Sequence, residues 1–365
     1  MRCTSSISPR RAARGARRTD ASAPGALSDA RERCTARVAV LGAGSFGTAL
    51  ALLLARNGHS VSLWGRDGPH VRDLDRAREN VRDLPGFRFP DGLTVGSDLT
   101  IAGAADVVVL AVPSAAFAAT VAALAALDSV PSRLVWGTKG FDPQAPRLLS
   151  EVAHELLPAG TALAVLSGPT FAREIAADLP AAVTVAAADG ADAAAAAALF
   201  HGPRFRAYAS TDLVGVQVGG AVKNVLAIAA GVADGLGFGA NTRAALVTRG
   251  LAELTRLGAA LGGRTETFMG LAGLGDLVLT CTDDQSRNRR FGLAIAGGAS
   301  AAAAQTDVGQ VVEGARTARQ VVAIAARLGV EMPICEQVEA LVRGATTPTA
   351  AVTSLLARDP RSEDV

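Results

Sequence analysis

The stretch RVAVLGAGSFG at residues 37–47 sets the first expectation for the fold, because an apolar segment runs directly into a glycine-rich turn. A helical pattern follows the turn and continues to Ala55. Strand, G-x-G-x-x-G spacing and helix together indicate a site for the pyrophosphate of a dinucleotide. Gly42 permits the tight turn, Gly44 lets the pyrophosphate approach the backbone, and Gly47 allows close contact between helix and strand. The free N–H groups at the helix start favour the anion.

The choice of cofactor depends on two charged residues after the second expected strand, at residues 60–64. Asp67 lies twenty residues beyond Gly47, where an acid hydrogen-bonds the ribose 2′-OH of NAD. Arg66, at the same strand end, could instead pair with the 2′-phosphate of NADP. The alternative for both residues is that they are only solvated, which is the commoner case for an Arg-Asp pair in a loop. Of the two cofactors, NADPH is favoured here and NADH stays possible.

Further short apolar segments predict that the sheet continues. Residues 85–96 are rich in Pro and Gly and are expected to form a surface loop. In an open parallel sheet ligands bind outside the carboxyl ends of the strands. The turn at residues 167–172 follows such a strand, and it fits either a second ligand or a plain connection to a helix. The expected strands are residues 107–112, 133–137, 162–166, 182–187 and 205–208.

Lysine is rare in this chain. Of 36 basic residues, only Lys139 and Lys223 are lysines and the others are arginines. Arginine keeps its proton in proteins, whereas burial and neighbouring charges readily shift the pKa of lysine. Lys139 follows the strand at residues 133–137, where cofactor and substrate would meet. Both lysines are therefore candidates for proton transfer; the alternative is two ordinary exposed lysines in an arginine-rich chain.

The pattern changes near residue 210, where β-branched runs give way to long Ala, Leu and Gly patterns that indicate helices. A helix is expected at residues 213–230, with Lys223 on it and glycines at 215, 219 and 220 that admit close neighbours. A loop at residues 235–239 precedes a second helix at 241–261.

A phosphate site is a possibility near residue 286. Ser286 is a plausible N-cap, which would leave the N–H groups of Arg287 and Asn288 free at a helix start. The guanidinium of Arg287 would complete the cradle. The alternative is a basic, solvated helix face.

Length and composition indicate two domains. The chain has 365 residues, and its hydrophobic content of 49 % allows a large core. We expect a disordered extension at 1–36, for which a transit peptide is the alternative, a dinucleotide-binding domain at 37–209 and a helical domain at 210–365. The uncharged residues 107–127 are long enough to span a bilayer, but Pro113 divides them, so no membrane span is expected. The four Cys and four His do not cluster, so neither disulfides nor a metal site is expected.

Taken together, the motifs resemble those of the bacterial-type NAD(P)-dependent glycerol-3-phosphate dehydrogenases. The resemblance spans about residues 38–356 and leaves out the N-terminal extension. Many motifs in one order make it specific, which the glycine turn alone would not. The matching segments are GAGSFGTAL, LWGRD, WGTKG, SGPTFAREIA, GVQVGGAVKNV, GLGFGANTRAALVTRGLAE, FMGLAGLGDLVLTCT, QSRNRRFG and VVEG.

The resemblance implies an α/β fold with a Rossmann-like N-terminal domain, an all-helical C-terminal domain and a site in the cleft between them. Lys223 matches the family's catalytic acid/base. The cofactor residues implied, with the glycine turn, are Gly42, Gly44, Ser45, Phe46, Gly47, Arg66, Lys139, Ala172, Arg287, Val311 and Glu313. The substrate residues implied are Lys139, Gly168, Thr170, Lys223, Asp276, Ser286, Arg287 and Asn288.

The resemblance also implies the reaction, a reversible hydride transfer between NAD(P)H and dihydroxyacetone phosphate that gives sn-glycerol 3-phosphate for phospholipid synthesis. We expect a cytoplasmic enzyme without nucleic-acid partners, and a homodimer is one option for its assembly. Two rivals remain at this stage. One is a dehydrogenase for a β-hydroxy acid or keto acid, and the other is a protein that senses NAD(P) without catalysis and needs neither lysine.

Overall fold

The computed structural model describes residues 35–358, and an eight-stranded sheet dominates their first half. The strand order is β10-β9-β8-β7-β6-β1-β2-β5, and neighbours are parallel except β8 and β9. A separate hairpin pairs β3 (Glu79–Asn80) with β4 (Leu84–Arg88). The sheet strands are β1 (Arg37–Leu41), β2 (Ser60–Trp64), β5 (Leu93–Gly96), β6 (Val107–Leu110), β7 (Arg133–Trp136), β8 (Ala162–Ser167), β9 (Ala181–Ala187) and β10 (Phe205–Ser210).

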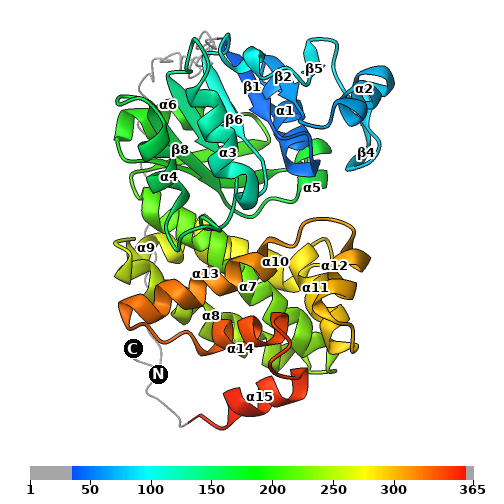
Figure 1. Ribbon diagram of the computed structural model, residues 1–365, viewed down its shortest axis with the longest axis vertical. Coiled ribbons are helices and arrows are strands. Elements are labelled where there is room, and N and C mark those ends of the chain that lie inside the picture. The colour runs from blue at the N-terminus through cyan, green and yellow to red at the C-terminus, as the bar shows by residue number, and fades with distance from the viewer. Residues whose placement is uncertain (1–34, 359–365) are drawn as a thin grey trace, which may run out of the picture. The chain divides into compact units, whose positions relative to one another are not determined.

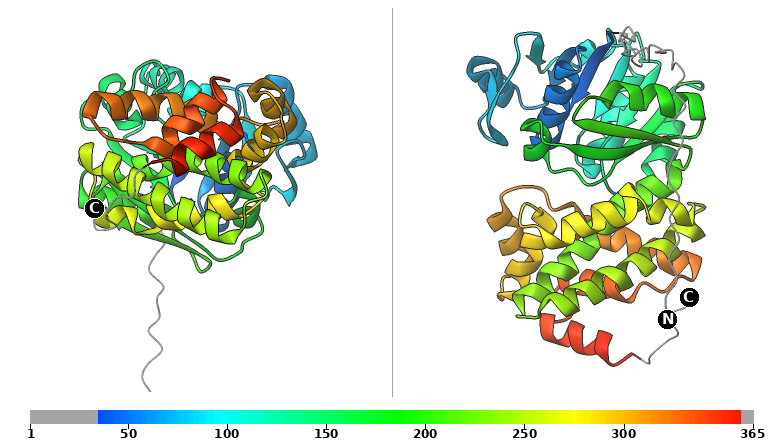
Figure 2. Two further views of the ribbon diagram at one scale, coloured as in Figure 1. Left: turned by 90° about the horizontal axis from the view of Figure 1, so that it is seen from below. Right: turned by 180° about the vertical axis from the view of Figure 1, so that it is seen from behind.

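Helices cover both faces of the sheet because successive side chains of a buried strand point to opposite sides. In β1, Val38 and Val40 pack in one apolar cluster with α1 and α6, while Ala39 and Leu41 pack in another with α3 and α4. Figure 1 shows α3 and α4 in front of the sheet. The right view of Figure 2, seen from behind, shows α6 on the opposite face. The helices of this half are α1 (Ser45–Arg56), α2 (Gly68–Ala77), η1 (Leu99–Ala102), α3 (Ser114–Ala125), α4 (Leu149–Leu156), α5 (Ala172–Ala176) and α6 (Gly190–Phe200).

One expectation about the sheet is wrong. Residues 85–96 are not a plain surface loop, because they contain most of β4 and all of β5, and β5 pairs with β2 at the sheet edge. The buried Leu93 anchors this short strand, and the surrounding Pro and Gly residues conceal it in the sequence. The sheet is also not wholly parallel, because β9 runs against β8.

The second half is helical and is built around α7 (Leu213–Gly235), which is buried from Gly215 to Ala233. A Cβ on Gly219 would overlap the carbonyl oxygen of Ala272, and one on Gly220 would come within 2.6 Å of Oγ of Ser167. The expected close packing at these glycines is therefore confirmed. The other elements are α8 (Ala240–Ala260), α9 (Thr265–Phe268), the π-helical turn η2 (Leu271–Gly275), α10 (Asp276–Thr282), α11 (Arg287–Ala296), α12 (Ala301–Val308), α13 (Glu313–Leu328), α14 (Pro333–Val342) and α15 (Pro348–Leu356).

The helix α7 is five residues longer than the pattern predicted, so the expected loop at 235–239 begins one residue later. By length and composition α7 could cross a membrane, but 89 % of its most apolar window is buried inside the protein. That burial fits a core helix. Residues 107–127, the other long uncharged run, divide into β6 and α3.

The predicted domain boundary at 209/210 falls at the end of β10, three residues before α7 begins. Residues from Thr35 onward belong to one compact unit, so the division into two domains stays a prediction. The predicted extension at 1–36 lies outside the described residues, except for its last two positions.

Candidate active site

The glycine turn between β1 and α1 has the geometry that its spacing predicts. Gly42 has φ +123°, and a Cβ there would lie 2.6 Å from the carbonyl oxygen of Ala111. A Cβ on Gly47 would overlap the carbonyl oxygen of Gly42, so both positions require glycine. A Cβ on Gly44 meets nothing within 4 Å, and α1 begins there without a side-chain cap. The open space above Gly44 and the uncapped N–H groups of α1 fit a pyrophosphate.

Three residues flank this turn. Phe46 packs its ring against Gly137, at the end of β7. Asp67 caps α2 by accepting from the N–H of His70 at 3.4 Å, and it also pairs with Arg82 at 3.5 Å. Arg66 is exposed and makes no hydrogen bond or ion pair with any residue between 35 and 358. The acid of this pair is thus engaged within the protein, and the guanidinium is available.

Both lysines of the chain lie on the same carboxylate. Nζ of Lys223 donates to Oδ1 of Asp276 at 2.8 Å, and Nζ of Lys139 donates to Oδ2 at 2.5 Å. The side chain of Asp276 is 1 % exposed, that of Lys223 is 8 % and that of Lys139 is 15 %. Ammonium groups so deep in a protein are rare unless they are paired. The two lysines are therefore buried ion-pair partners of one carboxylate rather than exposed surface charges.

Three separate elements bring this cluster together. Lys139 follows β7, Lys223 lies on the buried α7, and Asp276 is the first residue of α10, directly after the π-helical turn η2. π-Helical turns occur frequently at functional sites. The contact of Lys139 with Asp276 joins the sheet half to the helical half of the chain.

Thr280 also holds Lys223, which the sequence reading missed. Its Oγ1 accepts from Nζ of Lys223 at 2.6 Å and donates to the backbone carbonyl of Asp276 at 2.6 Å. The available signal was the spacing, because residues i and i+4 share one face of a helix. Ser167 was passed over as well, although its hydroxyl donates to Asp276 Oδ2 at 3.5 Å.

Burial and charge act against each other in this cluster. The pKa of Lys223 is lowered to about 8, chiefly by burial; Asp276 opposes this shift, and the charge of Lys139 adds to it. Burial alone would raise the pKa of Asp276, but Lys139 and Lys223 outweigh burial and hold that pKa below its usual value. The carboxylate therefore stays charged, and the amine of Lys223 can gain or lose a proton near neutral pH.

The turn after β8 reaches the same cluster. The carbonyl oxygen of Gly168 accepts from Nζ of Lys139 at 3.3 Å and from the hydroxyl of Thr170 at 3.2 Å. Gly168 has φ +155°, and a Cβ there would lie 3.0 Å from Cα of Val183. Ala172 is the half-buried first residue of α5. The turn at residues 167–172 therefore lies beside Lys139, and its role as a ligand site stays a prediction.

The start of α11 has the predicted cap. Ser286 accepts from the N–H of Arg289 at 3.2 Å, which leaves the N–H groups of Arg287 and Asn288 without that partner. Arg287 is half-buried and makes no hydrogen bond or ion pair with another residue in the described part of the chain. Burial lowers the pKa of Arg287, although the charge of Glu313 opposes the shift. A partly buried guanidinium without a partner beside free N–H groups fits a phosphate.

Asn288 has a different side-chain environment from the one expected of a substrate ligand. Its amide nitrogen donates to Oδ1 of Asn224, next to Lys223, at 2.9 Å, and its Oδ1 accepts from the N–H of Gly314 at 2.9 Å. The buried side chain therefore ties α7, α11 and α13 together. Contact with a substrate would use its backbone N–H.

The segment that carries Val311 and Glu313 meets the sheet half. The carboxylate of Glu313 accepts from the hydroxyl of Ser114 at 2.6 Å and from its N–H at 3.2 Å, so it caps α3. Val311 is half-buried two residues earlier. Within residues 35–358, no three His, Cys, Asp or Glu side chains gather as a metal site would require.

Two family models match most of this chain. The family model described as the N-terminus of NAD-dependent glycerol-3-phosphate dehydrogenase matches residues 37–193, and the C-terminal model matches residues 212–353. The glycerol-3-phosphate dehydrogenase [NAD(P)+] of Shewanella amazonensis is 54 % identical over 331 residues, which is 90 % of this chain and 98 % of the relative. The corresponding protein of Xanthomonas campestris is 52 % identical and covers 90 % and 97 %.

Solved structures extend the likeness to the fold. The crystal structure of a glycerol-3-phosphate dehydrogenase from Coxiella burnetii superposes with a TM-score of 0.85 at 45 % identity, over 89 % of this chain and 99 % of the other. A yeast glycerol-3-phosphate dehydrogenase follows with a TM-score of 0.75 at 27 % identity, over 89 % and 100 %. The expected architecture, a Rossmann-like sheet half with an all-helical half, is confirmed.

Proposed function

The chain belongs to the NAD-dependent glycerol-3-phosphate dehydrogenase family, an oxidoreductase for the reversible reduction of dihydroxyacetone phosphate, and we propose that Lys223 is its proton donor and acceptor. The observation that carries the proposal is the single amine held by Asp276 and Thr280 at 2.8 and 2.6 Å. The pKa of that amine is lowered, chiefly by burial, to about 8. An acid/base group works best when its pKa lies near the pH of the reaction. A protein that only senses NAD(P) needs no buried pair of lysines on one carboxylate. The donors of Arg287 and Asn288 at the start of α11 argue against a dehydrogenase for a β-hydroxy acid or keto acid, because they suit a phosphate.

Lys223 would act at the carbonyl oxygen of the ketone. Its ammonium would donate a proton to that oxygen during reduction, and the neutral amine would accept one during oxidation of the alcohol. Asp276 would hold the amine in place and keep its proton affinity from falling further. Lys139, on the other oxygen of Asp276, would contact both substrate and cofactor. Gly168 and Thr170 would line the substrate side of this cluster.

The other end of the substrate would lie on α11. Arg287 and the backbone N–H groups of Arg287 and Asn288 offer the donors that a phosphate requires. Ser286 would hold this helix start by its cap. A site with these donors prefers dihydroxyacetone phosphate to dihydroxyacetone, because loss of the phosphate leaves a half-buried guanidinium unpaired.

A nicotinamide cofactor supplies the hydride when it is bound. The turn Gly42, Gly44, Ser45, Phe46 and Gly47 would hold its pyrophosphate, and Arg66 the adenosine side. The other residues that would contact the cofactor are Lys139, Ala172, Arg287, Val311 and Glu313. We favour NADPH over NADH because Arg66 is exposed and unpaired, while the carboxylate of Asp67 is engaged by the start of α2.

The location, the assembly and the metabolic role of the enzyme are also proposals. We propose a cytoplasmic location, and a homodimer that light scattering on the purified protein would detect. Cell fractionation tests the location, and membrane-bound activity would contradict it. The product is a building block of phospholipids, so we place the reaction ahead of phospholipid synthesis.

The test is the absorbance decay of NADPH with dihydroxyacetone phosphate, for the wild type and for Lys223→Met. We expect turnover to fall by about 10²–10⁴-fold, or about 3–5.5 kcal/mol of barrier, because positioned proton transfer contributes that much. Binding of NADPH, followed by its fluorescence, should persist in the variant. Near-normal turnover of Lys223→Met would remove the assigned role. The same assay with NADH tests the cofactor preference, and an equal or higher kcat/KM with NADH would overturn it.

A further inference from the structure

The start of α11 lies beside Lys223 because α11 runs alongside α7 in the same direction. At the first turn of α11, Asn288 donates to Asn224, the neighbour of Lys223, at 2.9 Å. At the far end of both helices, a Cβ on Gly235 would lie 2.5 Å from Cβ of Ala296. A slide of α11 along α7 would therefore move the N–H groups at the start of α11 away from the amine of Lys223.

Arg289, in the first turn of α11, opposes such a slide through both its backbone and its side chain. Its N–H donates to Oγ of Ser286 at 3.2 Å, and its Nε and Nη2 donate to Oδ2 of Asp234 at 3.1 and 2.7 Å. Asp234 is the second-last residue of α7, and Nη1 of Arg289 also contacts Asp284. A Cβ on Gly231 would overlap the carbonyl oxygen of Arg289, so the backbones of the two helices touch here. The guanidinium thus ties the start of α11 to the last turn of α7.

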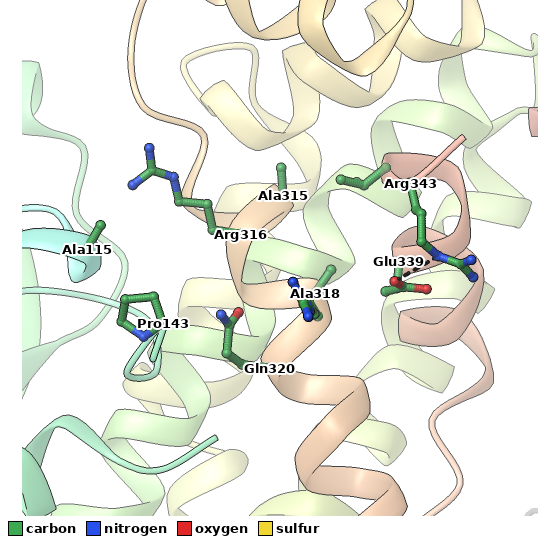
Figure 3. A pocket seen from close by; sticks show the side chains of 10 residues that line it. Ala115, Pro143, Ala315, Arg316, Ala318, Gln320, Glu339 and Arg343 are labelled. Carbon is green, nitrogen blue, oxygen red and sulfur yellow. Dashed lines mark hydrogen bonds and ion pairs between the residues drawn. The ribbon is translucent and has the colours of Figure 1, made fainter. Parts of the chain in front are cut away.

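The pair of Arg289 and Asp234 is buried, because their side chains are only 10 % and 7 % exposed. A buried ion pair adds little net stability, since the loss of solvation offsets the attraction, and its best-attested role is to fix one arrangement of the chain. The last turn of a helix also disfavours a carboxylate. Figure 3 shows a contrasting pair beside a groove lined by α13 and α14, where Arg343 contacts Glu339 with its side chain 66 % exposed. The place of α11 on α7, rather than net stability, accounts for the buried pair.

We propose that Arg289 is a positioning residue for the phosphate end of the substrate, an inference that rests on the proposed phosphate cradle at the start of α11. The guanidinium of Arg289 is occupied by Asp234 and Asp284, so it acts through its neighbours rather than as a phosphate ligand. It holds Arg287 and the free N–H groups of the first turn in place relative to Lys223. Binding groups need such support, because they work only within about 0.5 Å of the productive geometry.

The experiment compares dihydroxyacetone phosphate with dihydroxyacetone in the NADPH absorbance assay, as the ratio of their kcat/KM values. In Arg289→Gln this ratio should fall about tenfold or more, through a higher KM for dihydroxyacetone phosphate with kcat within about threefold of the wild type. A general loss of stability would lower both kcat/KM values and leave their ratio unchanged. Arg289→Lys keeps the charge but loses the planar fork, so its ratio should lie between those of wild type and Arg289→Gln. Arg289→Lys decides the matter if circular dichroism shows that Arg289→Gln does not fold.

Arg243→Gln is the matched control, because Arg243 pairs with the other oxygen of the same carboxylate. Its Nη2 lies 2.9 Å from Oδ1 of Asp234, and it reaches that oxygen from α8 rather than from α11. The ratio of the two kcat/KM values should therefore stay within about threefold of the wild type in Arg243→Gln. An equal fall of the ratio in Arg243→Gln and Arg289→Gln would overturn the proposal, because the effect would then belong to the carboxylate and not to the tie between α7 and α11.

Arg287→Gln separates this inference from the cradle on which it rests. A ratio that falls in Arg287→Gln but in neither variant of Arg289 would overturn the positioning role and leave the cradle standing. An unchanged ratio in Arg287→Gln would overturn the cradle, and the positioning role with it. In the double variant Arg287→Gln/Arg289→Gln, the loss should be smaller than the product of the two single losses, because both residues act on one phosphate. Losses that multiply in full would contradict the proposal.

Discussion

Two buried acids in the helical half of the chain have opposite pKa shifts. Asp276 and Glu253 are 1 % and 2 % exposed, so both lose nearly all contact with water. The pKa of Asp276 falls below its usual value, whereas burial raises the pKa of Glu253 to about 7. The difference lies in their partners rather than in their depth.

Glu253 accepts only from neutral groups. Its two oxygens take the backbone N–H groups of Ile334 and Cys335 at 2.7 and 3.2 Å, so it caps α14 from the neighbouring α8. Asp276 instead lies between two ammonium groups, one on each oxygen. At Glu253 two backbone N–H groups do not offset the cost of burying the charge, whereas at Asp276 two full charges do. The second arrangement holds two ammonium groups on one carboxylate, and the first positions a helix.

Replacing each acid by its amide should give the largest contrast. Asp276→Asn leaves Lys139 and Lys223 close together without a counter-charge, which destabilises a buried pair by about 3–5 kcal/mol. It also removes the group that supports the proton affinity of Lys223. We expect turnover with dihydroxyacetone phosphate to fall by about 10²–10⁴-fold. Steady-state kinetics and thermal unfolding of the purified variant measure both effects.

Glu253→Gln is the control for that experiment, because it makes the same chemical change at the other buried acid. Its turnover should stay within about threefold of the wild type, since Glu253 touches none of the lysines. Similar losses of turnover in both variants would mean that Asp276 acts through general stability, and the comparison would fail.

The sequence reveals these two acids unequally. Strand, glycine turn and helix follow from spacing, and the rarity of lysine points to Lys139 and Lys223 together. Asp276 comes only from the family resemblance, because the contact between α7 and α10 spans 53 residues and leaves no local pattern. Glu253 escapes notice altogether. On an amphipathic helix such as α8 a single Glu has the pattern of a surface charge, and only the packing of α14 buries it.

Other misses have the same cause. β5 is four residues long among Pro and Gly, and its pairing with β2 decides that it is a strand. The direction of β9 depends on the path of the chain after α5, and the periodicity of apolar residues does not predict that path. The side-chain amide of Asn288 binds Asn224 and Gly314, which lie on other helices and which no local pattern indicates; contact of its backbone N–H with a substrate stays a prediction. Local spacing therefore predicts elements well, but it predicts the partners of a buried side chain poorly.

The pH dependence of turnover tests the cluster of Asp276 with its two lysines, and its expected effect is smaller than that of Asp276→Asn. For reduction, kcat/KM should be constant below the Lys223 pKa of about 8 and fall about tenfold per pH unit above it, because the ammonium is the donor. Oxidation of sn-glycerol 3-phosphate should show the opposite limb. Lys139→Met removes a like charge that lowers the pKa of Lys223, so the limb should move to higher pH. A limb that stays in place, or moves to lower pH, would contradict this coupling.

The smallest expected effect concerns Glu253, the buried acid with neutral partners. Because burial raises the pKa of Glu253 to about 7 from 4.5, its protonation favours the folded state. Its contribution is complete below pH 4.5 and is lost as the pH rises through 7, by at most about 3 kcal/mol. Glu253→Gln cannot ionise, so the wild type should lose more stability than this variant between pH 5.5 and pH 8. Urea midpoints at both pH values measure the difference, and Glu266→Gln on an exposed site of α9 is the matched control. A gap between wild type and Glu253→Gln that is the same at both pH values would show that Glu253 stays charged in the fold, as Asp276 does.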